Sequence, residues 1–313
     1  MEIRAPALPA GGRDVHFVQQ RKAPMEKSEQ TFKRLKDTAT DLPTLPVVLQ
    51  RLRGAVNDPN SGAQDVARII QDDPAMVARV LKVVNSAFYG TLEPITSVQA
   101  AVARMGMRAI QNTALCTSVF TCFGDEAGHL FDREQFWRHS ISTGIAARII
   151  YERAAGRLDA RYTTDQLHIA GLLHDVGKIV AEQYLHEDFA AALALSRDAA
   201  LPLVEAETRV LGTDHAAIGA WLGTQWQLEP GLLAVIGHHH TPTTAQAEPA
   251  LVAICCVANY ICNIEDLGDS GNPKPQMIPH IWKELGLEVS DISDVVDLIH
   301  EAEGQSDILM AFV

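Results

Sequence analysis

The stretch HIAGLLHDVGKIV, residues 168–180, has the apolar character of a buried helix, yet it carries a histidine and an aspartate side by side at its centre. A buried carboxylate without a partner is strongly unfavourable, or it takes up a proton. Something must therefore neutralise Asp175. A metal ion or the ammonium group of Lys178, one turn beyond His174, can each do so, and the sequence leaves both open.

The composition is that of an ordinary globular protein. The 313 residues are 47% apolar and 21% charged, which allows a large core in one large or two ordinary domains. The net charge of −13 argues against nucleic-acid binding, because that affinity comes from clustered lysine and arginine. No apolar run has the length of a signal peptide or membrane span, and the five cysteines lack disulfide or zinc spacing. We expect a cytoplasmic protein without membrane or nucleic-acid partners.

Residues 41 to 123 read as a first block of helices. Ser61 and Ser97 are expected N-caps, and Asp73 followed by proline opens another helix. Gly90 is an expected helix stop, and Gly106 separates two helices. No stretch alternates with the period of two that a strand requires, so the sequence predicts an all-α fold.

A second helical block follows the polar segment GDEAGHLFDRE, residues 124–134, and we place a domain boundary near residue 128. Residues 1–28 lack periodicity and are expected to form a flexible leader, with order beginning near residue 41. The second block is expected to contain helices at about 133–154, 164–175, 178–197, 203–211, 214–226, 230–239, 248–264, 277–285 and 291–303.

Four histidines lie on the apolar faces of these helices, because each is three, four or seven positions from apolar residues. They are His139, His174, His215 and His239. One inward histidine is more often a hydrogen-bonded core residue than a ligand. Four of them with Asp175 favour a metal site.

Mixed imidazole and carboxylate ligands suit Mn, Fe, Ni or Zn, and Mg less well. A His-Asp pair at a helix end lets the imidazole bind one ion while the carboxylate spans two, as in two-metal phosphohydrolases. Lys178 would then hold a phosphate oxygen. The alternative for Lys178 is a simple ion pair with Asp175.

The segment GLLHDVGK resembles the signature of the HD superfamily of metal-dependent phosphohydrolases. The order LPTLPVV, IIQDDPAMVARVLKVVNSAFYG, ITSVQAAVARMG, FWRHS, GLLHDVGK, LGTDHAAIGAWL and HHHTP, over about residues 40–264, narrows the resemblance to the HDOD family, the HD-related output domain. This resemblance implies a helical bundle as N-terminal lobe, residues 29–128, packed on a degenerate HD-type helical domain, residues 129–313.

The resemblance also implies a metal-ligand set. His139 matches the leading histidine, His174 and Asp175 the doublet, His215 the following histidine, and the paired histidines match at positions 239 and 240. The HD enzymes close the site with a late aspartate.

This chain has Asn259 at the position of that late aspartate, within ICCVANYICN, on the inward face of its helix. A neutral amide should weaken cation affinity. No GYP segment follows His239 and His240, which disfavours the cyclic-di-GMP phosphodiesterase subtype.

Three functions follow from these observations. The resemblance implies a non-catalytic output or regulatory protein of bacterial signalling that binds receiver, kinase or cyclic-di-GMP turnover proteins and keeps a vestigial or structural metal site. The alternative is a metal-dependent phosphohydrolase acting on a nucleotide or other phosphoester, with Asp175 and Lys178 as catalytic residues. A third possibility is a bound metal or small ligand that stabilises the fold or senses a signal without turnover.

Overall fold

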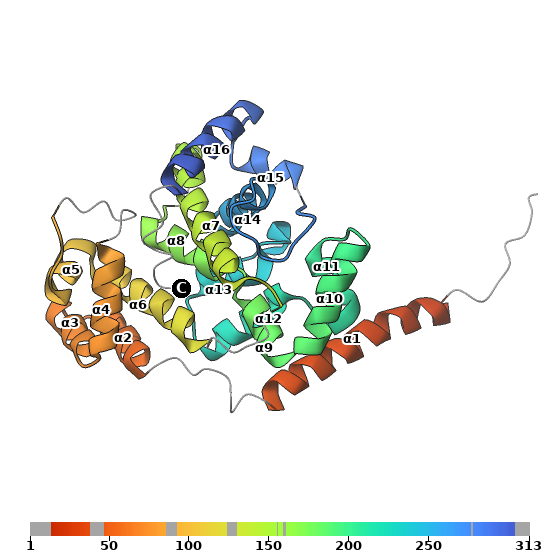
Figure 1. Cartoon of the computed structure of the whole chain (residues 1–313), viewed down its shortest axis with the longest axis horizontal. Coiled ribbons are helices and arrows are strands. Elements are labelled where there is room, and N and C mark those ends of the chain that lie inside the picture. Colours follow the sequence, from red (N-terminus) through yellow and green to blue (C-terminus); the bar gives the residue numbers. More distant parts are fainter. Residues whose placement is uncertain are drawn as a thin grey trace, which may run out of the picture.

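The computed structural model describes residues 14–37, 47–85, 93–123, 130–154, 156–158, 161–276 and 278–303. Within these ranges the regular structure consists of α-helices and the 3-10 turn Pro242–Thr244, and there are no strands. The all-α prediction is confirmed (Figure 1). Among the described helices, none is long and apolar enough to cross a membrane.

The N-terminal lobe is a bundle of five helices that pack mainly on one another. They are α2 (Val47–Asn57), α3 (Ala63–Gln71), α4 (Pro74–Val84), α5 (Val98–Met105) and α6 (Met107–Cys122). Asp73 caps α4, since its carboxylate accepts from the Met76 N–H at 3.0 Å, and Ser97 caps α5 in the same way. Gly106, with φ of 89°, separates α5 from α6 as expected.

The N-cap expected at Ser61 is wrong, and two other expectations cannot be compared with the described residues. The N-cap of α3 is Gly62 and not Ser61, because the Asp65 carboxylate accepts from the Gly62 N–H at 3.0 Å and fixes the start of the helix there. The expected stop at Gly90 and the boundary near residue 128 lie outside the described residues. The division into three segments therefore stays a prediction.

The second block surrounds α7, which packs against α8, α14 and α16. Its helices are α7 (Arg133–Ala154), α8 (Thr164–Leu173), α9 (Val176–Tyr184), α10 (His186–Asp198), α11 (Leu203–Leu211), α12 (His215–Gln225), α13 (Pro230–His238), α14 (Pro249–Ile264), α15 (Pro279–Glu284) and α16 (Val289–Glu303). The junction between α8 and α9 consists of His174 and Asp175, the pair that interrupts the quoted stretch.

The single helix expected at 178–197 is wrong, because the chain forms two helices there. Leu185 leaves helical geometry, with φ of −129° and ψ of 34°, and its N–H closes α9 on the Ala181 carbonyl at 2.9 Å. Its side chain is buried in the core, and α10 then packs along α11. Periodicity alone does not reveal such a break, since both helices continue the apolar pattern.

Order begins earlier than residue 41, because α1 (Asp14–Asp37) is helical across half of the expected leader. This helix packs on α11 (Figure 1). Thr31 and Leu35 are buried, and the Thr31 hydroxyl donates to the Leu211 carbonyl at 2.8 Å. The expectation overlooked this tertiary contact, which lies 180 residues away in the sequence.

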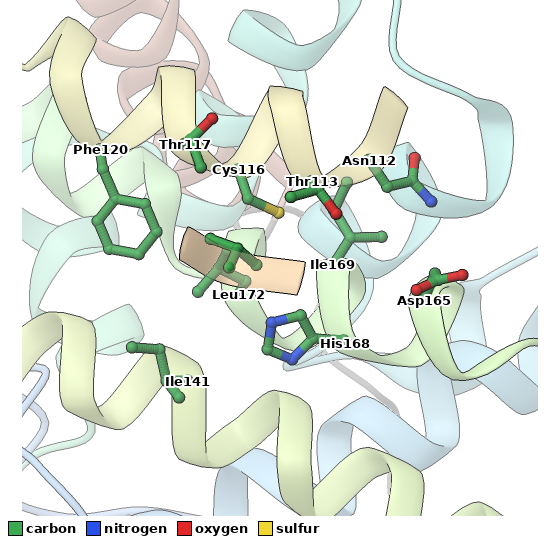
Figure 2. A pocket seen from close by; sticks show the side chains of 11 residues that line it. Asn112, Thr113, Cys116, Thr117, Phe120, Ile141, Asp165, His168, Ile169 and Leu172 are labelled. Carbon is green, nitrogen blue, oxygen red and sulfur yellow. The ribbon is translucent and has the colours of Figure 1, made fainter. Parts of the chain in front are cut away.

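The two blocks meet where α6 packs on α8 (Figure 2). Cys116 and Thr113 of α6 face Ile169 and His168 of α8, around a hollow of about 20 Å³. Burial raises the pKa of the Cys116 thiol well above its ordinary value, so the side chain is a neutral packing residue and not a nucleophile.

Candidate metal centre

The structure brings the predicted site residues together in the core of the second block. His139 comes from the middle of α7, and His174 and Asp175 form the junction of α8 and α9. The remaining ligand candidates are His215 at the start of α12, His239 and His240 just after α13, and Asn259 on α14. The side chains of His139, His174 and Asp175 have no exposed surface, whereas that of His240 is partly exposed.

Asp175 is the hub of the cluster. Its Oδ1 lies 3.1 Å from Nε2 of His215 and 3.4 Å from Nε2 of His239. Its Oδ2 lies 3.3 Å from Nε2 of His174 and 3.9 Å from Nε2 of His139. The carboxylate is thus shared by two groups of possible ligands. One group is Asp175, His215, His239 and His240, and the other is His139, His174 and Asp175.

Hydrogen bonds on the outer side of three rings fix which nitrogen carries the proton. Nδ1 of His174 lies 2.6 Å from the Gly171 carbonyl, and Nδ1 of His239 lies 3.0 Å from the Ile236 carbonyl. Nδ1 of His215 lies 2.6 Å from the Glu207 carboxylate. Because these partners are acceptors, Nδ1 is the donor in each ring, and in a neutral imidazole Nε2 is a lone pair aimed at Asp175.

The donor set fits a cation. Nε2 of His174, Nε2 of His239 and Oδ1 of Asp175 are buried and have no hydrogen-bond partner among the described residues. When the rings of His174 and His239 are neutral, their Nε2 lone pairs and the Asp175 carboxylate repel one another unless a positive charge lies among them. Histidine held by an outer carboxylate or carbonyl is also the usual arrangement of a metal-ligating imidazole.

Lys178 supplies one positive charge to this cluster. Its ammonium group donates to Oδ2 of Asp175 at 2.6 Å and to the Ser270 hydroxyl at 3.0 Å, and the side chain is buried. Of the two roles that the sequence left open, the geometry shows the ion pair with Asp175. Lys178 stands on one side of the carboxylate, and the imidazoles of His215 and His239 approach the other oxygen.

Asn259 points into the site, as its helix face predicted. Its Oδ1 lies 3.0 Å from Nε2 of His139 and accepts from Nδ2 of Asn263 at 2.6 Å. An oxygen that accepts from the amide of Asn263 also accepts from His139, so Nε2 of His139 carries the proton in this arrangement. His139 is therefore held by the neutral amide rather than by a carboxylate.

Burial and charge shift the titration of these groups. Burial lowers the pKa of His139 to about 3 and that of His239 to about 4, so both are neutral imidazoles. Burial alone would lower the pKa of His215 as well, but the Glu207 carboxylate outweighs it and raises the pKa to about 9. Burial disfavours ionised Asp175, yet the positive charges of His174, when its ring is protonated, and of Lys178 hold the pKa of the carboxyl well below its ordinary value.

Three residues of the site escaped the sequence analysis: Glu207, Asn263 and Ser270. Glu207 is buried and lies four residues from both Leu203 and Leu211, so its position on an apolar stripe could have revealed it. Asn263 follows Asn259 by one helical turn, which is a weaker signal. Ser270 lies in the loop after α14, where no periodicity applies.

The mouth of the centre is narrow. A hollow of about 20 Å³ lies beside His239 and His240, and amide side chains line most of its polar wall. These amides are Asn259, Asn263, Asn272 and Gln276. Among the described residues that line the hollow there is no lysine or arginine.

Comparison with known proteins places the chain in a family. The family model described as HDOD domain matches residues 42–242. The chain belongs to the HDOD domain family. The resemblance inferred from the motifs is confirmed, and the matched region of this HDOD domain contains all the histidines and the aspartate of the centre. Asn259, Asn263 and Ser270 lie beyond it.

An uncharacterised protein of Treponema pallidum is 29% identical to this HDOD protein over 234 residues. That alignment covers 74% of the chain but only 44% of the relative, so the chain spans less than half the length of the curated protein that it matches.

Two solved structures have similar folds. An HDOD domain protein of unknown function from Geobacter sulfurreducens has a TM-score of 0.66 at 24% identity, covering 90% of this chain and 96% of its own. A protein of Shewanella amazonensis, provisionally described as a phosphohydrolase, has a TM-score of 0.68 at 23% identity, covering 89% and 97%. Both show the helical HDOD fold.

Proposed function

We propose that this HDOD protein is a non-catalytic regulatory protein of signal transduction, which acts by binding other proteins and keeps its metal centre as a structural element. The observation that carries the proposal is the closed centre. Asp175, His139, His174, His215 and His239 are buried, His240 is partly buried, and the hollow beside His239 and His240 measures about 20 Å³.

The small size of the hollow argues against a phosphoester at the centre. One water occupies about 10 to 15 Å³ of such a volume, so the space beside His239 and His240 accommodates about one water molecule. A phosphate group also needs cationic partners, and the described lining of the hollow offers amides. The ammonium group of Lys178 is already engaged by Asp175 and Ser270, and the His215 ring is held by Glu207.

Asn259 supports the same conclusion. Its amide holds His139 at 3.0 Å, at the position where the HD enzymes place a carboxylate. A neutral oxygen contributes less to binding a divalent cation than a carboxylate does. The centre thus keeps the histidines that shape it while it has lost one of its negative charges.

The residues suited to hold a metal are the two groups that share Asp175, and the candidate ions are Mn, Fe, Ni, Zn or Mg. A bound divalent ion would add its binding free energy to the stability of the folded state. The partners that we propose are signalling proteins, namely receiver, kinase or cyclic-di-GMP turnover proteins.

The experiment combines metal content with activity. Purified protein is analysed for bound metal and assayed against a panel of phosphomonoesters and phosphodiesters, next to Asn259→Asp. We expect no turnover by the wild-type chain, and a lower thermal midpoint after chelation if an ion is bound. Metal-stimulated turnover by the wild-type protein would contradict the proposal.

A phosphohydrolase is the alternative, and one observation favours it. Asp175 is shared by both groups of ligands, which is the arrangement that a two-ion site needs. In that case Asp175 would bridge the ions and Lys178 would hold a phosphate oxygen. Hydrolysis that is unchanged in Asp175→Ala would exclude this alternative.

A further inference from the structure

A second cavity, with a different lining from that of the metal centre, lies between the two helical blocks. It has a volume of about 520 Å³, within the range of sites for small ligands. Helices α2 and α6 of the N-terminal lobe form one side, and α8, α13 and α14 of the second block form the other. We call it the interlobe cleft.

The floor of the interlobe cleft is apolar. Buried side chains from four helices meet there: Leu115, Ile169, Leu232 and Leu251. Such a floor contributes affinity through removal of apolar surface from water but does not discriminate between ligands. Selectivity must come from the polar side chains above it.

These polar side chains are mainly carboxamides. Gln50 and Asn57 stand on α2, and Gln111 and Asn112 stand on α6. Among the described residues, none of these four amides donates or accepts a hydrogen bond through its side chain. Because each carboxamide carries two N–H donors and an oxygen acceptor, the wall offers donors and acceptors next to one another.

The charged residues of the cleft balance and are already engaged. Arg108 forms an ion pair with Glu229 at 2.5 Å, and Arg53 donates to the backbone carbonyls of Trp226 and Gln227 at 3.2 Å. The Tyr162 hydroxyl donates to Glu248 at 2.9 Å. Two arginines against two glutamates leave no net charge, so the cleft gives an anionic ligand no electrostatic advantage.

We propose that the interlobe cleft is a binding site for a small uncharged ligand that presents a neighbouring N–H donor and C=O acceptor, together with an apolar or flat body for the floor. A nucleoside base edge and a peptide bond share this chemistry. The ligand would contact α2 and α6 on one side and α13 and α14 on the other, and it would thereby hold the two blocks together. This proposal does not depend on the function proposed for the metal centre.

The test is calorimetric titration of the full chain with three probes. Guanosine and N-acetyl-leucinamide represent the nucleoside and peptide sources, and guanosine monophosphate tests the charge argument. We expect one of the two uncharged probes to bind with one-to-one stoichiometry and to raise the thermal midpoint. If guanosine is the one that binds, the monophosphate should bind no more tightly, because the two arginines and two glutamates of the cleft leave no net charge to favour the phosphate.

Variants show whether the binding occurs in the cleft. Gln111→Leu and Gln50→Leu remove one carboxamide each from different helices, and each should weaken binding about fivefold to tenfold. Gln64→Leu, an exposed glutamine on α3 outside the cleft, is the matched control and should change nothing. The proposal is overturned if neither uncharged probe binds at millimolar concentration, if both cleft variants bind like the wild type, or if the monophosphate binds more tightly than guanosine.

Discussion

The metal centre and the interlobe cleft are both polar, but they arrange their polar groups in opposite ways. The centre packs ionisable side chains against one another in the core and leaves a hollow of about 20 Å³. The cleft has a volume of about 520 Å³ and neutral amides in its wall, and its ion pair between Arg108 and Glu229 is exposed. Ionisable groups that converge in the core depend on one another, or on a bound cation, for their charge balance, whereas neutral polar groups that face open space are available to a ligand.

The largest expected effect is at the hub of the centre. Asp175→Asn keeps the shape of the side chain but leaves the buried ammonium of Lys178 without its counter-charge. Breaking a buried ion pair by removal of one partner costs about 3 to 5 kcal/mol. Urea unfolding should show a loss of that size in the free energy of unfolding. A loss of less than about 1 kcal/mol in the free energy of unfolding is typical of an exposed ion pair. Such a result would mean that the buried centre and the cleft do not differ in their contribution to stability.

Acid should destabilise the chain through its buried histidines, when a chelator keeps metal away. Burial holds the pKa of His239 and that of His168 at about 4, below the ordinary value of 6.5. Between these values the unfolded chain takes up protons that the folded chain does not, so stability falls as the pH drops from 6.5 towards 4. Thermal midpoints measured across this window should decrease steadily, and a flat profile would show that these rings are not buried as described.

Glu207→Gln should have a smaller effect with a distinct signature. The Glu207 carboxylate holds the His215 ring at 2.6 Å and raises its pKa to about 9, against the effect of burial. The variant should lower the pKa of His215 from about 9, because Asp175 alone then opposes the effects of burial and of Lys178, and it should lower stability by about 1 to 3 kcal/mol. NMR titration of the ring checks the first expectation. A pKa that stays near 9 would mean that another group holds the proton.

The smallest expected effect is at the cleft. Glu229→Gln removes the charge from the exposed pair with Arg108, whose contribution should be about 0 to 1 kcal/mol. Urea unfolding next to Asp175→Asn gives the comparison directly, since both changes turn a carboxylate into an amide. A cost for Glu229→Gln as large as that for Asp175→Asn would show that the cleft, too, is part of the structural core.

Much of the centre could be predicted because helical periodicity decides which way a side chain faces. His139, His215 and Asn259 were expected to point inward, and they converge on Asp175 or on one another. Periodicity says nothing about contacts between distant segments. The packing of α1 on α11 and the bond between Lys178 and Ser270 arise only in the folded chain.

The break at Leu185 was missed for a related reason. Both flanking helices bury apolar residues at helical spacing, so the pattern runs through the junction without a glycine or proline to mark it. The sequence also did not reveal the interlobe cleft, because the spacing of Gln50 and Gln111 is that of ordinary surface residues of a helix. Only the packing of α6 on α8 gives them a common space.

The most direct test of a closed, non-catalytic centre is the hydrolysis of an activated phosphodiester by the protein loaded with Mn, Fe or Ni, measured side by side with Asp175→Asn. We expect the same background rate for both proteins, because the hollow of about 20 Å³ beside His239 and His240 is too small for the substrate. Metal-dependent turnover that the substitution abolishes would contradict it.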